Sequence, residues 1–255
     1  PTATNDSPTN DADNDYGNYC RIDPNAIHVA STTNGNKSAT STATDRGLGF
    51  GTLPFDSEDA IGFYFEIVPK TSAGSTIGAF ALGACTADVI SIAATRPTDS
   101  NAASWIFHGD GGINHTAYIT NGAWDSQANG TGALNDTFQF VYKNGSCYFG
   151  INDTWYDSSD GSFGNAGSAF DSITGMLYPM LSHGSASVCT WDLLTADEDF
   201  NMTKPTGLKN IGTHTMPDPA IPDPTKHHQV ELVSHDGTST NVTCNWDMDV
   251  YDTLI

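Results

Sequence analysis

The chain has few basic residues, little glutamate and no long apolar run, and each shortage excludes a class of protein. Nine Lys and Arg stand against 30 Asp and Glu among 255 residues, so the formal net charge is −21. Because a nucleic-acid-binding surface must neutralise phosphates, we expect no nucleic-acid partner, and an anionic membrane surface is disfavoured for the same reason. No stretch approaches the roughly 20 apolar residues of a membrane-spanning helix, so no membrane span is expected.

Cysteine is sparse and scattered. The five cysteines are Cys20, Cys85, Cys147, Cys189 and Cys244. They form no CxxC or Cys/His cluster, which argues against a zinc site. An odd number excludes complete pairing within the chain. Buried free thiols are favoured, and one or two disulfides are the alternative.

The ends of the chain lack the usual processing signals. The sequence opens PTATNDSPTNDADNDYG, with no initiator Met and no signal peptide pattern, and it ends in the strand-like run WDMDVYDTLI. We therefore expect a piece of a longer polypeptide or a processed product.

The residues that are abundant favour strands and loops. Glycine occurs 25 times and proline 12 times, and nearly all the acid is Asp, which favours turns rather than helix interiors. Asn144-Gly145 lies between two aromatic runs and predicts a type I′ hairpin. Residues 61–69 alternate Phe63, Phe65 and Ile67 with polar or smaller neighbours, which predicts a half-buried strand that ends at Pro69. Evenly spaced short strands of this kind predict an all-β fold, an antiparallel β-sandwich.

Four parts follow from the pattern. Residues 1–18 read as an extended acidic arm and residues 19–195 as the sandwich. Residues 196–226 contain five prolines and predict a Pro-rich exit segment, either an extended segment that wraps over the surface or a linker. Residues 227–255 regain strand character and predict the start of a further β module or a strand-exchange arm.

Several segments together resemble one known family. The opening phrase DSPTNDADNDYGNYCRIDP is followed by FYFEIVP, IGAFALG, CYFGINDTWY and LYPMLSHGSASV, and then by a Pro-rich exit at residues 205–228. In this order they resemble the SPRY-type, concanavalin-like jelly-roll domains of bacteriophage virion proteins. The resemblance covers about four fifths of the chain.

The resemblance implies a function without identifying a ligand. It implies a non-catalytic virion structural or surface-adhesion module, a capsid decoration or tail fibre on the virion surface. Its partners would be other copies of the same protein and a host-surface glycan or protein. One alternative is a secreted, extracellular glycan-binding lectin, and a second is a glycoside hydrolase with an atypical motif.

The search for catalytic chemistry favours a protein that is not an enzyme. The E-x-D-x-x-E pattern of concanavalin-like glucanases is absent, because Val68 and Lys70 follow Glu66 at the spacings where acids are needed. Glycan binding instead uses exposed aromatics with polar neighbours. Six candidates lie at predicted strand ends or turns: Trp105, His108, Asp110, Trp124, Trp155 and Tyr156. For the Trp residues, core packing is the favoured reading, and Trp191 is assigned to the core outright.

Two acidic loops raise the question of a metal. Asp11, Asp13 and Asp15 have D-x-D-x-D spacing, which can wrap a structural calcium ion, but the Gly and Glu of an EF-hand loop are missing. A solvated acidic arm is favoured. Asp157 and Asp160, which precede Gly161, form a second acidic loop that could likewise bind a calcium ion or be simply solvated. No other cofactor is expected.

Sequons for N-glycosylation are frequent. They begin at Asn5, Asn36, Asn114, Asn129, Asn135, Asn144, Asn152, Asn201 and Asn241. These are candidate glycosylation sites if the chain is exported. Alternatively, the Asn residues serve turn geometry in a β protein, and this reading is slightly favoured.

Overall fold

The fold is all-β and its strands pair antiparallel. The computed structural model describes residues 18–26, 29–41, 47–72, 80–87, 104–108, 113–115, 117–119, 132–156, 158–183, 188–215, 231–232 and 244–245. The chain divides into two compact units, Pro1–Met216 and Pro217–Ile255. Within the second unit, β15 (Glu231–Leu232) pairs with β16 (Cys244–Asn245). Residues 1–17 of the predicted acidic arm lie outside the described residues.

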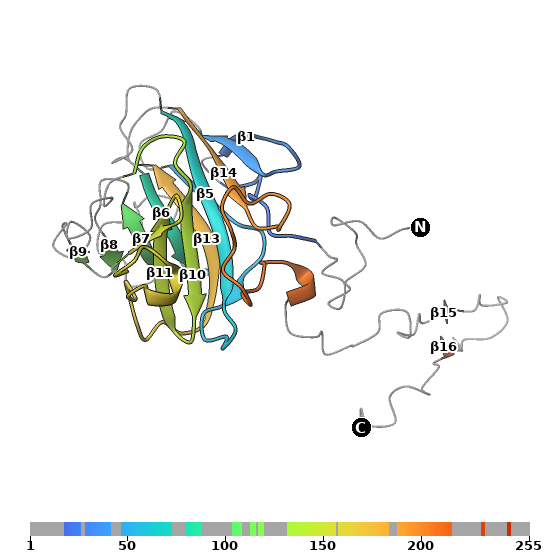
Figure 1. Cartoon of the computed structure of the whole chain (residues 1–255). Helices are drawn as coiled ribbons and strands as arrows, with labels where there is room; N and C mark the ends of the chain where they lie inside the picture. The colour runs from blue at the N-terminus through green and yellow to red at the C-terminus, as the bar shows by residue number, and fades with distance from the viewer. Residues whose placement is uncertain are drawn as a thin grey trace, which may run out of the picture. The chain divides into compact units, whose positions relative to one another are not determined.

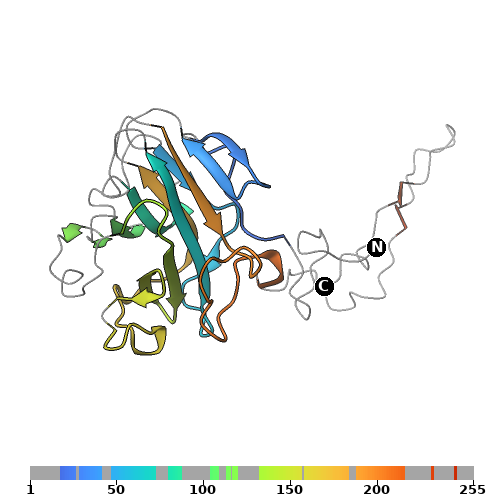
Figure 2. The ribbon, with the colours of Figure 1, turned by 45° about the horizontal axis from the view of Figure 1, so that its top comes forward.

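Two large sheets make up the first unit (Figures 1 and 2). The first sheet has the order β1 (Val29–Thr33), β2 (Ser38–Ser41), β14 (Cys189–Leu194), β5 (Phe63–Ser72), β10 (Phe138–Lys143), β11 (Ser146–Ile151) and β12 (Thr154–Trp155). The second has the order β3 (Gly47–Phe50), β13 (Met176–His183), β6 (Phe80–Cys85), β7 (Ser104–His108), β8 (Ile113–His115) and β9 (Ala117–Ile119), and β4 (Phe55–Asp56) also pairs with β13. Two 3-10 turns complete the elements, η2 (Phe163–Asn165) and η3 (Thr213–Thr215).

Left-handed turn residues join the strands of the first sheet. The predicted hairpin at Asn144-Gly145 is confirmed: φ is 51° and 73° at the two residues, and Lys143 pairs with Ser146. Asn152 and Asp153 join β11 to β12 in the same way, with φ of 49° and 63°. Asn tolerates this conformation better than most residues, because its short polar side chain can satisfy local backbone groups.

An apolar core fills the space between the two sheets. The inner faces contribute aromatic side chains that meet across the layers. Phe107 of β7 lies 5.4 Å from Phe138 of β10 and 6.1 Å from Phe149 of β11, measured between ring centroids. Trp191 is buried in this core, as predicted. Full burial of each such ring stabilises the fold by about 1.5–3 kcal/mol, so this layer accounts for much of the driving force.

Strand β5 differs from the prediction of a half-buried strand. Both faces are buried, because Tyr64, Glu66 and Val68 are as inaccessible as their alternating neighbours. The strand also continues past Pro69 to Ser72. The proline is accommodated because the ladder with β10 ends at Ile67 and the ladder with β14 shifts register between Thr190 and Trp191. Proline has no N–H to donate, and such an irregularity does not require one.

The segment after β14 is what covers the outer face of β5. Residues 195–215, which we call the strap, run beside β5 and β10 (orange in Figure 1). Phe200 packs edge-on against Tyr64 with ring centroids 4.8 Å apart, and Leu208 joins the cluster that includes Tyr64, Val141 and Trp155. Of the two readings predicted for 196–226, the surface-wrapping segment describes residues 196–215, which belong to the first unit. Residues 216–226 lie outside the described residues.

The four cysteines in the described part of the first unit are free and buried: Cys20, Cys85, Cys147 and Cys189. This agrees with the favoured prediction of buried thiols. Burial raises the pKa of Cys20 and Cys189 to about 11 and that of Cys85 to about 12, because a thiolate loses its hydration. None of the helices in the described residues is long and apolar enough to cross a membrane.

Candidate functional site

An open polar groove of about 490 Å³ lies on the outer side of the first sheet. Its volume falls within the range of about 300–1,000 Å³ that is usual for ligand sites. The β1–β2 hairpin forms one wall, the start of the strap forms the other, and β14 lies between them. The lining residues are Asn34, Lys37, Ser38, Asp192, Leu194, Glu198, Asp199 and Asn201.

The hairpin wall is shaped by three consecutive left-handed residues. Asn34, Gly35 and Asn36 have φ of 54°, 64° and 64°, which turns the chain tightly between β1 and β2. The amide of Asn34 donates a hydrogen bond to Ser38 Oγ (2.9 Å), so both groups are held at the groove. The carbonyl of Lys37 accepts a hydrogen bond from Leu193 N–H (2.8 Å), which fixes this wall to β14.

An ion pair spans the two walls of the groove. Lys37 Nζ lies 2.6 Å from Asp199 Oδ1, and Arg21 lies 3.4 Å from the other carboxylate oxygen. The Asp199 side chain is only 8% exposed. Asp199 Oδ2 has no hydrogen bond from the residues that the structure describes. A buried carboxylate of this kind depends on its cationic neighbours, since an unpaired buried charge is costly.

The other charges of the groove differ in their pairing. Asp192 pairs with Lys70 of the neighbouring strand at 3.2 Å. Glu198 is exposed, and it makes no ion pair or hydrogen bond with the described residues. With Asn34, Asn201 and Ser38 it gives the groove several hydrogen-bonding groups that face solvent. Such a surface can bind hydroxyl and amide groups, and the lining offers only Leu194 for apolar contact.

Glu66 of β5 holds the strap on the sheet through hydrogen bonds. Its carboxylate accepts hydrogen bonds from the Tyr64 hydroxyl (2.6 Å), from Asn201 N–H (2.8 Å) and from Met202 N–H (3.0 Å). The side chain is fully buried. Burial raises the pKa of this carboxyl, and the three hydrogen bonds partly oppose the rise. All of its partners are structural, so Glu66 is not placed to act as an acid on a ligand.

A second polar pair extends this buried network. Gln139 Nε2 donates to the Tyr64 hydroxyl (3.1 Å) and to Asp153 Oδ1 (2.9 Å), while Gln139 Oε1 accepts from Asp153 N–H (2.7 Å). Burial, and then the charge of Glu66, raise the pKa of Tyr64 far above its usual value. The phenol is therefore a permanent donor to Glu66, and it links the strap to the β11–β12 turn.

At the far end of the strap a partly buried ion pair adds a further contact. Lys209 Nζ lies 2.6 Å from Asp59, whose carboxylate also accepts hydrogen bonds from Ile61 and Gly62 N–H. Burial alone would raise the pKa of Asp59, but the Lys209 ammonium and the two backbone donors together lower it. Such a pair contributes little on its own because water screens it.

The predicted aromatic ligand residues are not brought together at an exposed site. Trp105, Trp155 and Tyr156 are buried, at 7%, 4% and 7% exposure. Trp155 packs edge-on against Phe163, with centroids 4.9 Å apart, so its face cannot stack on a sugar. The burial of Trp105 and Trp155 agrees with core packing, the favoured reading of the Trp residues, and it contradicts sugar stacking by any of the three residues. The side chain of His108 and the whole of Asp110 and Trp124 lie outside the described residues.

The acidic loop at Asp160 is filled by protein donors. Its carboxylate accepts hydrogen bonds from the Ser158 hydroxyl, from the Ser162 hydroxyl and N–H, and from the Asn165 amide, and these lower its pKa. These contacts favour a turn-capping role over a cation. Asp157 lies outside the described residues, as do Asp11, Asp13 and Asp15. No group of three potential metal ligands occurs in the described part of the chain.

Turn geometry explains most of the described sequons. Asn36, Asn135, Asn144 and Asn152 all have positive φ, whereas Asn201 and Asn114, whose backbone lies in β8, do not. Asn152 also accepts from Thr137 N–H (2.9 Å) and donates to Asp136 (2.8 Å). These roles favour the conformational reading. The side chain of Asn114 lies outside the described residues, as do Asn5, Asn129 and Asn241.

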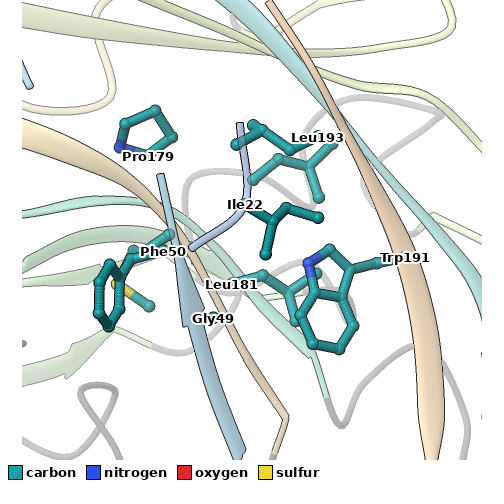
Figure 3. Close-up of a pocket in the computed structure, with 9 residues that line it drawn as sticks. Ile22, Gly49, Phe50, Pro179, Leu181, Trp191 and Leu193 are labelled. Carbon is teal, nitrogen blue, oxygen red and sulfur yellow. The ribbon is translucent and has the colours of Figure 1, made fainter. Parts of the chain in front are cut away.

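A second, internal cavity is too small to be a site. It lies between the sheets, where Trp191 and Leu193 of β14 face Leu181 and Pro179 of β13 (Figure 3). Its volume is about 10 Å³, at the limit for a single water molecule, and its lining is apolar. We interpret it as a packing gap of the core.

Comparison with known proteins finds no matching family model and no matching curated protein. The groove therefore has to be judged on its own geometry. Sequence reasoning did not identify these residues as a site, because they come from two segments far apart in the chain, 34–38 and 192–201. Two signals existed. Lys37 is one of only nine basic residues, and Glu66 lies in an apolar run where a carboxylate needs partners.

Proposed function

We propose that this chain is a non-catalytic recognition module, a virion structural or surface-adhesion domain of the concanavalin-like jelly-roll type, that binds a host-surface glycan through the groove. The open polar groove between the β1–β2 hairpin and the strap carries the proposal. The resemblance of the opening, strand and exit phrases supports the virion setting. Assembly with other copies of the chain is part of the same proposal.

The chemistry of the lining favours recognition over hydrolysis. Hydrolysis of a glycosidic bond needs two carboxyl groups facing one bond, one of them kept protonated. Glu66, the buried carboxyl with a raised pKa, is occupied by Tyr64 and by two backbone N–H groups. The groove carboxylates Asp192 and Asp199 are tied up in ion pairs. Amides, a hydroxyl and one unpaired carboxylate remain, and these suit hydrogen bonding to a polyhydroxylated ligand.

A secreted glycan-binding lectin of cellular origin is the alternative function. Its main support was the number of sequons, and positive φ at four of the six sequon Asn residues with a described backbone supplies another reason for them. The groove would serve a lectin equally well. Occupancy of Asn144 or Asn152 by glycans in the natural source would favour the secreted protein.

The test is a glycan array probed with the whole chain and with two matched variants. Asn34→Gly removes an amide from the groove but keeps the left-handed turn, and Asn144→Gly makes the same change at the hairpin outside the groove. We expect at least one glycan hit that Asn34→Gly weakens and Asn144→Gly retains, with the bound glycan recovered uncleaved. Absence of any hit, or equal effects of the two variants, would contradict glycan binding in this groove. Light scattering of the same protein tests assembly.

A further inference from the structure

The cations at the groove are already committed. Lys37 is held by Asp199 at 2.6 Å, and Lys70 by Asp192 at 3.2 Å. Arg21 does not line the groove, and it donates to Cys20 O and Thr195 Oγ1 as well as facing Asp199. An anionic ligand could gain Lys37 fully only by drawing it from Asp199, a carboxylate more than nine-tenths buried. The exchange would weaken the ion pair of the buried Asp199 carboxylate, and the cost of that loss opposes binding of the anion.

The groups that a ligand can reach favour a cation over an anion. Glu198 is exposed and makes no ion pair with the described residues. The amides of Asn34 and Asn201 each donate one hydrogen bond within the protein, to Ser38 Oγ (2.9 Å) and to Thr137 Oγ1 (3.2 Å), and each amide also has a second N–H and a carbonyl oxygen. Asp199 also lines the groove, and its Oδ2 atom receives no hydrogen bond from the described residues. The chain as a whole carries −21, so its long-range field repels anions and attracts cations.

Resting on the proposed glycan binding, we propose that the groove selects saccharides by charge: it takes neutral sugars, gains affinity from a protonated amine placed against Glu198, and rejects sugars that carry carboxylate groups. The amine supplies N–H donors to the one lining carboxylate that lacks a partner. A uronic acid or a sialic acid meets that carboxylate and finds no uncommitted cation in the lining. The selectivity is electrostatic and should therefore weaken as ionic strength rises.

The experiment compares three oligosaccharides of equal length by titration calorimetry. They are an N-acetylglucosamine oligomer, its deacetylated glucosamine form and a galacturonic acid oligomer, at about pH 6, where most of the sugar amines are protonated and the uronic acids are ionised. Each is measured with the whole chain, with Glu198→Gln and with Glu58→Gln, an exposed carboxylate outside the groove. A single exposed charge pair at about 4 Å in water corresponds to roughly a fivefold change in affinity.

We expect the amine form to bind about fivefold tighter than the neutral form, and the uronate weakest. Glu198→Gln should remove the amine advantage and Glu58→Gln should keep it, while salt at about 1 M should reduce it in the wild type. A uronate that binds as well as the amine, or an amine advantage that survives Glu198→Gln, would overturn the charge selection and leave glycan binding intact. No binding of any of the three would overturn the selection together with the glycan proposal.

Discussion

Replacing Glu66 with alanine removes the acceptor that holds the strap on the outer face of β5. Three donors lose their partner: the Tyr64 hydroxyl, Asn201 N–H and Met202 N–H. Tyr64 keeps its contact with Gln139, but the two backbone groups have no other acceptor in the described structure. A buried donor left without a partner costs about 1–3 kcal/mol. The strap lies near solvent, and water can partly replace the lost acceptor. We therefore expect the loss of both backbone hydrogen bonds to lower the free energy of unfolding by about 2–4 kcal/mol.

The loss should be large relative to the whole stability, since a domain is stabilised by only about 5–15 kcal/mol. Urea unfolding followed by tryptophan fluorescence measures it, and hydrogen exchange at residues 201 and 202 localises it. Glu58→Ala is the matched control, because Glu58 is exposed and accepts a single long hydrogen bond (3.3 Å) from Gly175. If Glu66→Ala costs no more than Glu58→Ala, and the two amides stay protected, Glu66 does not hold the strap.

The dependence on pH gives an independent check. Burial raises the pKa of Glu66 above its ordinary value of 4.5. Between 4.5 and the raised pKa, the native state keeps a proton that the unfolded state has released. The stabilisation from this group is therefore complete below pH 4.5 and is lost as pH rises through the folded pKa. Glu66→Gln cannot titrate, so the stability of the wild type relative to this variant should fall across that window. A constant difference would contradict the assigned shift.

Three further predictions test the core and the turns. Gly49→Ala places a methyl group 2.5 Å from the Trp191 ring and should cost about 1–3 kcal/mol in urea unfolding, whereas Gly164→Ala, with only Ser162 Oγ at 4.0 Å, should cost less than 1 kcal/mol. Gly145→Ala should cost more than Gly175→Ala, because both have positive φ but only the first brings Cβ to 2.9 Å from a backbone oxygen, that of Ile173. Iodoacetamide at neutral pH should leave the four described thiols of the first unit unlabelled until urea is added, as peptide mass spectrometry would show, and labelling of the native protein would contradict their burial and raised pKa.

The features that sequence predicted well are local. The Asn144-Gly145 turn requires positive φ at adjacent residues, and the residues that allow this are visible in the sequence itself. The position of β5 and the burial of Trp191 followed from alternation and from apolar bulk. Free thiols were favoured because the cysteines fall inside strand-like runs. In each case the decisive interaction involves neighbours along the chain or a general preference for burial.

The features that sequence missed depend on distant partners. Trp155 lies near a turn, and the sequence left both a ligand-stacking role and core packing open; Phe163 from the following loop packs against it. The second face of β5 was expected to meet solvent, but the partners of Glu66 lie 135 and 136 residues away and are backbone N–H groups. Backbone groups carry no residue-specific signal. A pattern of alternating residues therefore cannot reveal that a proline-containing segment will cover a strand.

The strap is part of both the packed fold and the candidate site. Asn201 donates its backbone N–H to Glu66, while the same residue lines the groove beside Glu198 and Asp199. Without the strap, the hairpin at Asn34 would face open solvent and Lys37 would lose its partner. The strap wall of the groove thus depends on the contacts that hold the strap on the sheet, and the buried carboxylate of Glu66 supplies two of them. Glu66 lacks the acidic neighbours of a glucanase motif, and in the structure it is a positioning residue that holds one wall of the groove in place.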